Sequence, residues 1–155
     1  MVQNFLVNHL HKKGVVILDF GSQYTQLIAR RVREHNVYSK IVAPGTTLDE
    51  ILYQDPAAII LSGGPSSIYE KNAPDFDFNI INSELPILGI CYGLHLLAHY
   101  HGGKVSTEGK GEYGFTEVKI LVQDSIFKGV QSSKVWMSHG DQITKVPIGW
   151  EVLAN

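Results

Sequence analysis

The fold is decided by the stretch Pro86-Ile87-Leu88-Gly89-Ile90-Cys91-Tyr92-Gly93-Leu94-His95-Leu96-Leu97-Ala98-His99. Its first apolar residues predict a short buried strand, and the leucine spacing from about Tyr92 predicts a helix. Cys91, the only cysteine of the chain, lies at the turn between them, with Gly89 and Gly93 two residues away on either side. This Gly-x-Cys-x-Gly pattern is the thiol counterpart of the Gly-x-Ser-x-Gly nucleophile elbow.

Such an elbow favours a reactive thiolate. A tight strand-to-helix turn lifts the side chain out of the sheet, and the flanking glycines leave room for the neighbouring backbone. The helix that follows directs its dipole and its first N–H groups at the sulfur, which favours the thiolate over the thiol. The alternative is a small buried cysteine after a core strand, but the two glycines and the strand–turn–helix context favour a nucleophile.

The same alternation of strand and helix precedes the elbow. Apolar runs predict three earlier strands, at residues 14–20, 38–42 and 57–61. Helices are expected at residues 24–34, capped by Ser22, and at residues 48–53, capped by Thr47. This order predicts an α/β fold with an open, mostly parallel twisted sheet and flanking helices.

The pattern changes at the two ends of the chain. Residues 115–122 alternate between polar and apolar, as in an antiparallel or edge strand. Further strands are expected at residues 134–137 and from residue 149. We therefore expect a C-terminal region of antiparallel strands after the parallel sheet, and a loosely tied N-terminal extension over residues 1–13.

A glycine pair, Gly63-Gly64, follows the strand expected at residues 57–61. Ligands of parallel α/β sheets bind beyond the carboxyl ends of the strands, where this loop and Cys91 both lie. The loop lacks the further glycines and the lysine of a phosphate loop. Bare N–H groups beside a nucleophile can form an oxyanion hole, with the N–H of Tyr92 as a second donor. A plain glycine turn is the alternative.

Two groups of histidines require an interpretation. His95 and His99 are four residues apart on the expected helix, a spacing that can hold a metal, but no acidic residue or second cysteine stands at ligand spacing. No metal site is therefore predicted. His139 follows a strand in a polar loop, and it is either a site residue or an ordinary loop histidine.

The composition excludes several classes of protein. A hydrophobic content of 44% and a charged content of 18% are ordinary for a globular chain. The net charge of −2 argues against a general nucleic-acid binder. No apolar run approaches membrane-spanning length, and the N-terminus lacks the order of a signal peptide. One cysteine excludes an intrachain disulfide framework and fits a reducing cytoplasm.

Four motifs together resemble a known family. In chain order they are Asp19-Phe20-Gly21-Ser22-Gln23-Tyr24, Ser62-Gly63-Gly64-Pro65-Ser66-Ser67, Gly89-Ile90-Cys91-Tyr92-Gly93 and Trp136-Met137-Ser138-His139-Gly140-Asp141. They are similar to the glutamine amidotransferase domain of GMP synthetases, which are class I (triad-type) amidotransferases with a flavodoxin-like fold. The resemblance covers about residues 14–155.

The resemblance implies an enzyme that hydrolyses glutamine through a thioester on Cys91, with Gly64 and Tyr92 holding the oxyanion through their N–H groups. It implies substrate-binding roles for Gly63, His95, Ser138, His139 and Asp141. The ammonia would pass to an ATP-pyrophosphatase domain or chain, which aminates xanthosine monophosphate to GMP in purine biosynthesis. ATP and magnesium are implied only for that absent part, and no cofactor is expected on this chain.

The sequence departs from the family pattern in two places. The family usually carries glutamine where this chain has His95, and its base is a histidine in a later His-Pro-Glu segment that this sequence does not contain. We therefore expect an amidotransferase domain that is incomplete at its C-terminus and poorly active alone. Two alternatives remain: a non-catalytic remnant or binding module of the same fold, and another Cys-elbow amidotransferase or hydrolase that uses His139 or His95 as its base.

We predict that His95→Gln tightens glutamine binding. Histidine can donate one hydrogen bond at this position, but it cannot reproduce the paired donor and acceptor of an amide. A glutamine titration of the two forms measures the effect. An affinity unchanged between His95 and His95→Gln would contradict the prediction.

Overall fold

The computed structural model describes residues 13–107, 111–123 and 125–155. The chain divides into two compact units, one that ends at Leu97 and one that begins at Ala98. The predicted N-terminal extension lies outside the described residues except for Lys13, whose N–H donates to the Asp55 carbonyl oxygen at 2.9 Å.

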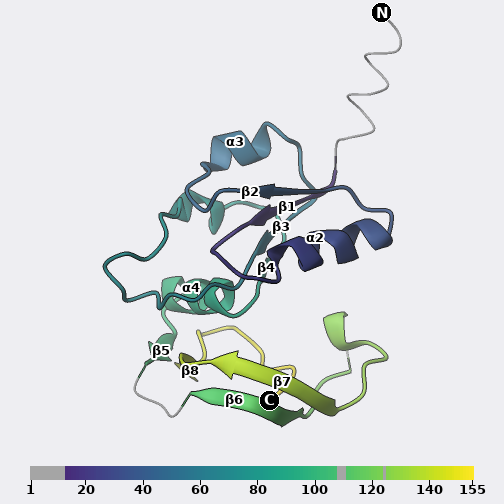
Figure 1. Cartoon of the computed structure of the whole chain (residues 1–155), viewed down its shortest axis with the longest axis vertical. Helices are drawn as coiled ribbons and strands as arrows, with labels where there is room; N and C mark the ends of the chain where they lie inside the picture. Colours follow the sequence, from purple (N-terminus) through teal and green to yellow (C-terminus); the bar gives the residue numbers. More distant parts are fainter. Residues whose placement is uncertain (1–12, 108–110, 124) are drawn as a thin grey trace, which may run out of the picture. The chain divides into compact units, whose positions relative to one another are not determined.

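The first unit is built on a parallel sheet whose strands lie in the order β2-β1-β3-β4 (Figure 1). The strands are β1 (Val15–Leu18), β2 (Ser39–Val42), β3 (Ala58–Leu61) and β4 (Ile87–Gly89). β1 pairs with β2 and β3 along its whole length, and β4 pairs with β3 alone among the described strands. This topology confirms the α/β fold with a mostly parallel sheet that the apolar runs predict.

Helices and a 3₁₀ turn connect the strands. They are α2 (Thr25–Glu34), α3 (Leu48–Leu52), η1 (Phe78–Ile80) and α4 (Tyr92–Tyr100). The expected cap of α3 is confirmed, because the Thr47 hydroxyl accepts from the Glu50 N–H and the Glu50 carboxylate accepts from the Thr47 N–H. The expected cap of α2 is wrong: the Ser22 hydroxyl accepts from the Tyr24 N–H at 3.1 Å, and Tyr24 itself is the N-cap residue.

Both faces of the sheet are covered, which explains the unbroken apolar runs of β1 and β3. Successive side chains of a strand point to opposite faces. Leu18 and Leu61 belong to the core that contains residues of α3, η1 and α4, and Ile17 and Ile60 belong to the core on the α2 side. Because each face has its own core, a strand with alternating polar residues does not fit at β1 or β3.

Asp77 fastens η1 to the first turn of α3. Its carboxylate accepts hydrogen bonds from the Leu48 N–H at 2.8 Å, the Asn79 N–H at 3.0 Å and the Asn79 side-chain amide at 2.9 Å. These bonds, that from Leu48 above all, stabilise the ionised carboxylate and lower the pKa of Asp77 below its ordinary value of 3.8. The polar segment that follows β3 is thereby held on the α3 side of the sheet.

The second unit contains two antiparallel pairs of strands (Figure 1). They are β5 (Lys104–Ser106) with β8 (Gln142–Lys145), and β6 (Glu112–Val118) with β7 (Ser133–His139), and η2 (Ser125–Phe127) lies between β6 and β7 in the chain. The expected antiparallel region is confirmed, although β5 and β8 are additional to the prediction. The strand expected from residue 149 does not form, and only an isolated bridge joins Ala154 to Ile120.

We predict that Asp77→Asn weakens the dependence of unfolding stability on acid pH. Folding lowers the pKa of this carboxyl, so its contribution is present above the unfolded pKa of about 4 and is lost as the pH falls through the folded pKa. The native chain should therefore lose stability more steeply than Asp77→Asn when it is acidified below about pH 4. Urea unfolding across this range measures the difference.

The matched control for this experiment is Asp75→Asn, which removes an exposed carboxylate two residues away. Its pH profile should follow that of the native chain. Parallel profiles for the native chain and Asp77→Asn would show that the hydrogen bonds to Leu48 and Asn79 do not contribute.

Candidate active site

Cys91 occupies a sharp turn between β4 and α4. Its φ is +50°, a left-handed conformation that residues other than glycine rarely adopt. The N–H of Ile90, the preceding residue, donates to the Leu61 carbonyl oxygen at 3.0 Å. The carbonyl oxygen of Cys91 accepts from the His95 N–H at 3.0 Å. The strand–turn–helix geometry of a nucleophile elbow is thus confirmed, with the half-buried thiol at the N-terminal end of α4.

The two glycines of the elbow are required by close packing. A Cβ on Gly93 would lie 2.4 Å from the Leu61 carbonyl oxygen, and a Cβ on Gly89 would lie 2.6 Å from the Leu94 nitrogen. Real Cβ atoms do not come so near to backbone atoms, so any side chain at either position would push α4 away from the ends of β3 and β4. The glycines therefore set the distance between α4 and the sheet.

The glycine loop after β3 lies directly against the cysteine. A Cβ built on Gly63 would be 3.4 Å from the Cβ of Cys91. A Cβ on Gly64 would be 2.4 Å from the Phe20 carbonyl oxygen, so Gly64 also has no room for a side chain. The structure thus brings Gly63, Gly64, Cys91 and Tyr92 together at the carboxyl ends of β3 and β4.

Ser62 holds this loop in position, a role that the sequence motifs did not indicate. Its hydroxyl accepts from the Phe20 N–H at 3.0 Å and donates to the Gly63 carbonyl oxygen at 2.8 Å. Its own carbonyl oxygen accepts from the Gly93 N–H at 3.1 Å. Ser62 is fully buried and so connects the ends of β1 and β3 with the first turn of α4.

The backbone N–H groups of Gly64 and Tyr92 are available at this edge. Neither donates a hydrogen bond within the described part of the chain. The Tyr92 ring is buried against the Phe20 ring, with centroids 5.0 Å apart. Burial, together with a smaller effect of the Glu70 carboxylate, raises the pKa of the Tyr92 hydroxyl. The side chain of Tyr92 therefore belongs to the core, and its N–H is the group that can act in the site.

His95 lies one helical turn after Cys91 on α4, and its side chain is only 8% exposed. A buried imidazole next to the elbow can position a substrate or a proton, whereas the histidines near the end of α4, His99 and His101, are exposed.

The remaining predicted residues belong to the second unit. Ser138 and His139 end β7, and Asp141 lies just before β8. The His139 Nδ1 lies 2.9 Å from the carbonyl oxygen of Asp141. Since a carbonyl oxygen can only accept, Nδ1 is the donor in this contact. This contact holds the His139 ring against the turn between β7 and β8.

Asp19, at the end of β1, has a structural part in the first unit. One carboxylate oxygen accepts from the Gly21 N–H at 3.0 Å and from the Thr25 hydroxyl at 2.8 Å. Thr25 is itself 1% exposed. These bonds shape the turn from β1 into α2. The Asp19 carboxylate therefore stabilises the backbone conformation of the motif at residues 19–24.

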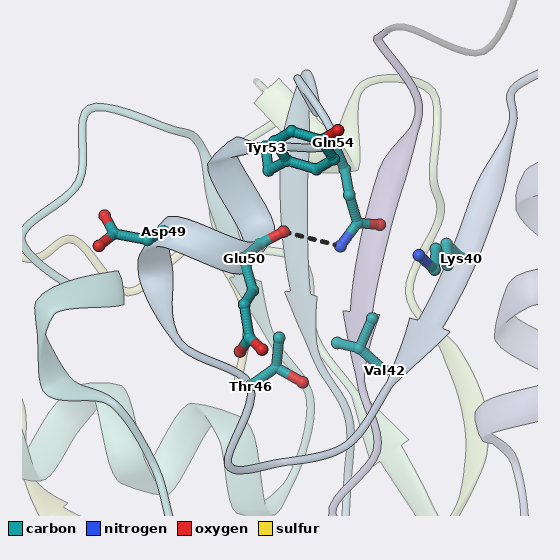
Figure 2. Close-up of a pocket in the computed structure, with 7 residues that line it drawn as sticks. All are labelled: Lys40, Val42, Thr46, Asp49, Glu50, Tyr53 and Gln54. Carbon is teal, nitrogen blue, oxygen red and sulfur yellow. Dashed lines mark hydrogen bonds between the residues drawn. The ribbon is translucent and has the colours of Figure 1, made fainter.

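A pocket of about 480 Å³ lies elsewhere in the first unit, between β2 and α3 (Figure 2). Its lining residues are Lys40, Val42, Thr46, Asp49, Glu50, Tyr53 and Gln54. The dashed line in Figure 2 joins the Gln54 side-chain nitrogen to the Glu50 carbonyl oxygen, at 3.0 Å. No predicted site residue lines this pocket, which is therefore separate from the elbow.

The described residues offer no metal centre. Among them, no group of three or more His, Cys, Asp and Glu side chains is placed to hold a metal ion. In the same part of the chain, no helix has both the length and the apolar character that crossing a membrane requires.

The elbow, the glycine loop and the His139 turn all lie within one family match. The family model described as "Glutamine amidotransferase class-I" matches residues 16–155. The chain belongs to the class-I glutamine amidotransferases. Its matched span includes residues of both compact units.

Curated relatives of this amidotransferase chain carry the name GMP synthase [glutamine-hydrolyzing]. That of Brachyspira hyodysenteriae is 52% identical over 142 residues, which cover 91% of this chain and 28% of the relative. That of Aquifex aeolicus is 49% identical over 146 residues, which cover 94% of this chain and 29% of the relative. The chain therefore spans less than a third of the length of these relatives.

Solved structures share the fold of this amidotransferase chain. A protein of Thermoplasma acidophilum described as a "putative gmp synthase subunit a protein" superposes with a TM-score of 0.76 at 28% identity, covering 93% of this chain and 73% of its own. A glutamine amidotransferase of Methylobacillus flagellatus superposes with a TM-score of 0.64 at 16% identity, covering 92% of this chain and 61% of its own. The second match shows the fold alone.

We predict that Cys91→Gly unfolds at a higher urea concentration than Cys91→Ala. Both variants lose the thiol, but only alanine keeps a Cβ at the positive φ of the elbow. Removing that strain should favour the glycine variant by about 1 kcal/mol. Equal midpoints would show that the left-handed turn is not strained in the folded chain.

Proposed function

We propose that this chain hydrolyses the side-chain amide of glutamine, with Cys91 as the nucleophile. The observation that carries the proposal is the placement of the thiol: Cys91 stands on a left-handed elbow beside the Gly63–Gly64 loop. Such a turn presents the sulfur to a ligand at the carboxyl edge of the sheet, and the N-terminus of α4 favours its thiolate.

In the first step the Cys91 thiolate attacks the amide carbon of glutamine and forms a C–S bond. The carbonyl oxygen becomes an oxyanion, which accepts hydrogen bonds from the N–H groups of Gly64 and Tyr92. One such donor is worth about 3 kcal/mol of barrier in enzymes that use it. The C–N bond then breaks, the nitrogen takes up a proton and leaves as ammonia, and the thioester remains.

In the second step water attacks the thioester carbon and loses a proton, and the C–S bond breaks. Glutamate leaves and the Cys91 thiolate is restored. Because cysteine is partly ionised without help, the first step needs less assistance from a base than a serine nucleophile would. We assign proton transfer, within this chain, to His95 or His139, the two histidines that the sequence offers near the site motifs.

The α-amino and α-carboxylate groups of glutamine are the natural ligands of the remaining residues. We propose that the Ser138 hydroxyl and the His139 ring hold this end of the substrate, that Asp141 assists there, and that Gly63 lines the site.

The curated relatives support a proposal for how the ammonia is used. The GMP synthases that match this chain are more than twice its length. We propose that the ammonia is delivered to an ATP-dependent amination of xanthosine monophosphate to GMP, on a further part of the same protein or on a partner chain. ATP and magnesium belong to that part. A single cysteine suits a reducing cytoplasm.

The test is ammonia release from glutamine by the purified chain. We predict release that depends on Cys91, so that Cys91→Ala falls to the background rate, because no other group of the elbow can form the thioester. A coupled glutamate dehydrogenase assay measures the ammonia. Release equal in the native chain and Cys91→Ala would reject glutamine hydrolysis by this chain.

A further inference from the structure

The hydroxyl of Ser62 connects two backbone groups beside the elbow. It accepts a hydrogen bond from the Phe20 N–H at 3.0 Å and donates one to the Gly63 carbonyl oxygen at 2.8 Å. An N–H can only donate and a carbonyl oxygen can only accept, so the direction of both bonds is fixed. The single proton of the Ser62 hydroxyl is therefore committed to Gly63.

The backbone of Ser62 is held without help from this hydroxyl. The Ser62 N–H donates to the Leu18 carbonyl oxygen at 3.1 Å, and the Ser62 carbonyl oxygen accepts from the Gly93 N–H at 3.1 Å. These two bonds attach the end of β3 to β1 and to the first turn of α4, and neither involves the side chain. The hydroxyl therefore acts on the peptide that follows Ser62 rather than on the position of Ser62 itself.

The peptide between Gly63 and Gly64 is the part of this loop with the most conformational freedom. A peptide unit turns over when ψ of its first residue and φ of its second residue change together, and glycine on both sides removes the Cβ atoms that restrict these angles. Gly63 is not tightly packed, because a Cβ built on it would meet its nearest atoms at 3.4–3.7 Å, which is ordinary contact. The loop sequence thus permits two orientations of this peptide, and the Ser62 hydroxyl favours one of them.

The favoured orientation directs the Gly64 N–H away from the core. The peptide bonds of the described residues are all trans, and in a trans peptide the C=O and the N–H point in opposite directions. The Gly63 carbonyl oxygen is bonded to the fully buried Ser62 hydroxyl, so the Gly64 N–H points away from it. A peptide turned over would direct the Gly63 carbonyl oxygen to the place of this N–H, where it would repel an oxyanion.

We propose that Ser62 is a positioning residue for glutamine hydrolysis, whose hydroxyl selects the orientation of the Gly63–Gly64 peptide in which the Gly64 N–H can donate to the oxyanion. This inference rests on the proposed function. The peptide begins next to the nucleophile, since a Cβ built on Gly63 would lie 3.4 Å from the Cβ of Cys91. Ser62 acts through this peptide alone, and its bond to Phe20 makes the end of β1 part of the same support.

Removal of the hydroxyl should lower kcat and leave KM nearly unchanged. The oxyanion forms only when the thiolate attacks, so a misdirected donor affects the transition state more than it affects bound glutamine. Loss of one oxyanion donor costs about 10²–10³-fold in kcat in an enzyme that uses it. We expect Ser62→Ala to lower kcat for ammonia release at least tenfold and to change KM by less than twofold, as measured by the coupled glutamate dehydrogenase assay.

Two variants of nearly equal shape separate the hydroxyl from packing. Threonine and valine are both β-branched, but only threonine keeps a hydroxyl on Cβ. Both crowd the fully buried position 62 to a similar extent, so the cost of crowding is shared. Ser62→Thr should keep kcat within about threefold of the native chain, whereas Ser62→Val should have a kcat at least tenfold below that of Ser62→Thr.

Ser39→Ala is the matched control. Ser39 is 2% exposed, and its hydroxyl donates to the Ala29 carbonyl oxygen at 3.0 Å. It begins β2, at the opposite edge of the parallel sheet from the elbow. Ser39→Ala should unfold at a lower urea concentration than the native chain but keep kcat within twofold. A loss of kcat as large as that of Ser62→Ala would assign both losses to general destabilisation and would overturn the proposal.

Crystal structures of Ser62→Thr and Ser62→Val show the direction of the peptide without requiring turnover. We expect the Gly63 carbonyl oxygen to accept from the threonine hydroxyl in the first variant and to turn away from residue 62 in the second. The same direction in both structures, or an equal kcat in both variants, would overturn the proposal. Failure of both Ser62→Ala and Ser62→Val to fold would also overturn it, because the hydroxyl would then be a requirement of the core.

Failure of the proposed function has a different signature. In that case the native chain releases no ammonia from glutamine in a Cys91-dependent way. The direction of the Gly63 carbonyl in the crystal structures of Ser62→Thr and Ser62→Val would still decide whether the hydroxyl selects the orientation of this peptide.

Discussion

The approach of α4 to β3 is the contact on which the candidate site depends. At Gly93 the helix backbone comes so near to the Leu61 carbonyl that no Cβ fits between them, and the Gly93 N–H donates to Ser62. The Ile90 N–H donates to Leu61 just before the turn. With both sides of the turn bound to the end of β3, Cys91 must complete a reversal of the chain within one residue. Its left-handed φ is the result, at a cost of the order of 1–3 kcal/mol.

The first unit could be predicted in most of its elements because its signals are local. β1 and β3 are covered on both faces, so their sequences are apolar throughout, and Thr47 with Glu50 carries a complete capping box. The N-cap of α2 was less predictable. Ser22 has the chemistry of a cap, but its hydroxyl bonds to Tyr24, because Asp19 and Thr25 already shape that turn. Competition among several short polar side chains is not visible in the sequence.

The second unit was harder to predict because its pairing is non-local. β5 has three residues and pairs with β8 almost forty residues later. The sequence pattern of so short a strand is not enough to predict its pairing partner. Residues near Leu153 suggested a strand, but they form only the isolated bridge of Ala154 with Ile120. Hydrogen bonds between Lys119 and Asn155, and from the N–H groups of Leu121 and Val122 to the Leu153 carbonyl oxygen, flank this bridge. At the elbow, the meeting of Gly63 with Cys91 followed from the shared carboxyl edge, whereas the burial of Ser62 and His95 depends on packing that no motif records.

β4, which leads into Cys91, is bonded to one neighbour among the described strands over only three residue pairs, and its Leu88 is 44% exposed. Strands at the margin of a sheet open at a lower free energy than those at its centre. The sulfur of Cys91 is thus attached to a strand at one margin of the sheet, whereas β1 and β3 each have two neighbours. Local opening of β4 would remove the turn geometry at Cys91 without unfolding the rest of the sheet. The reactivity of the Cys91 thiol would then report on the pairing of this one strand.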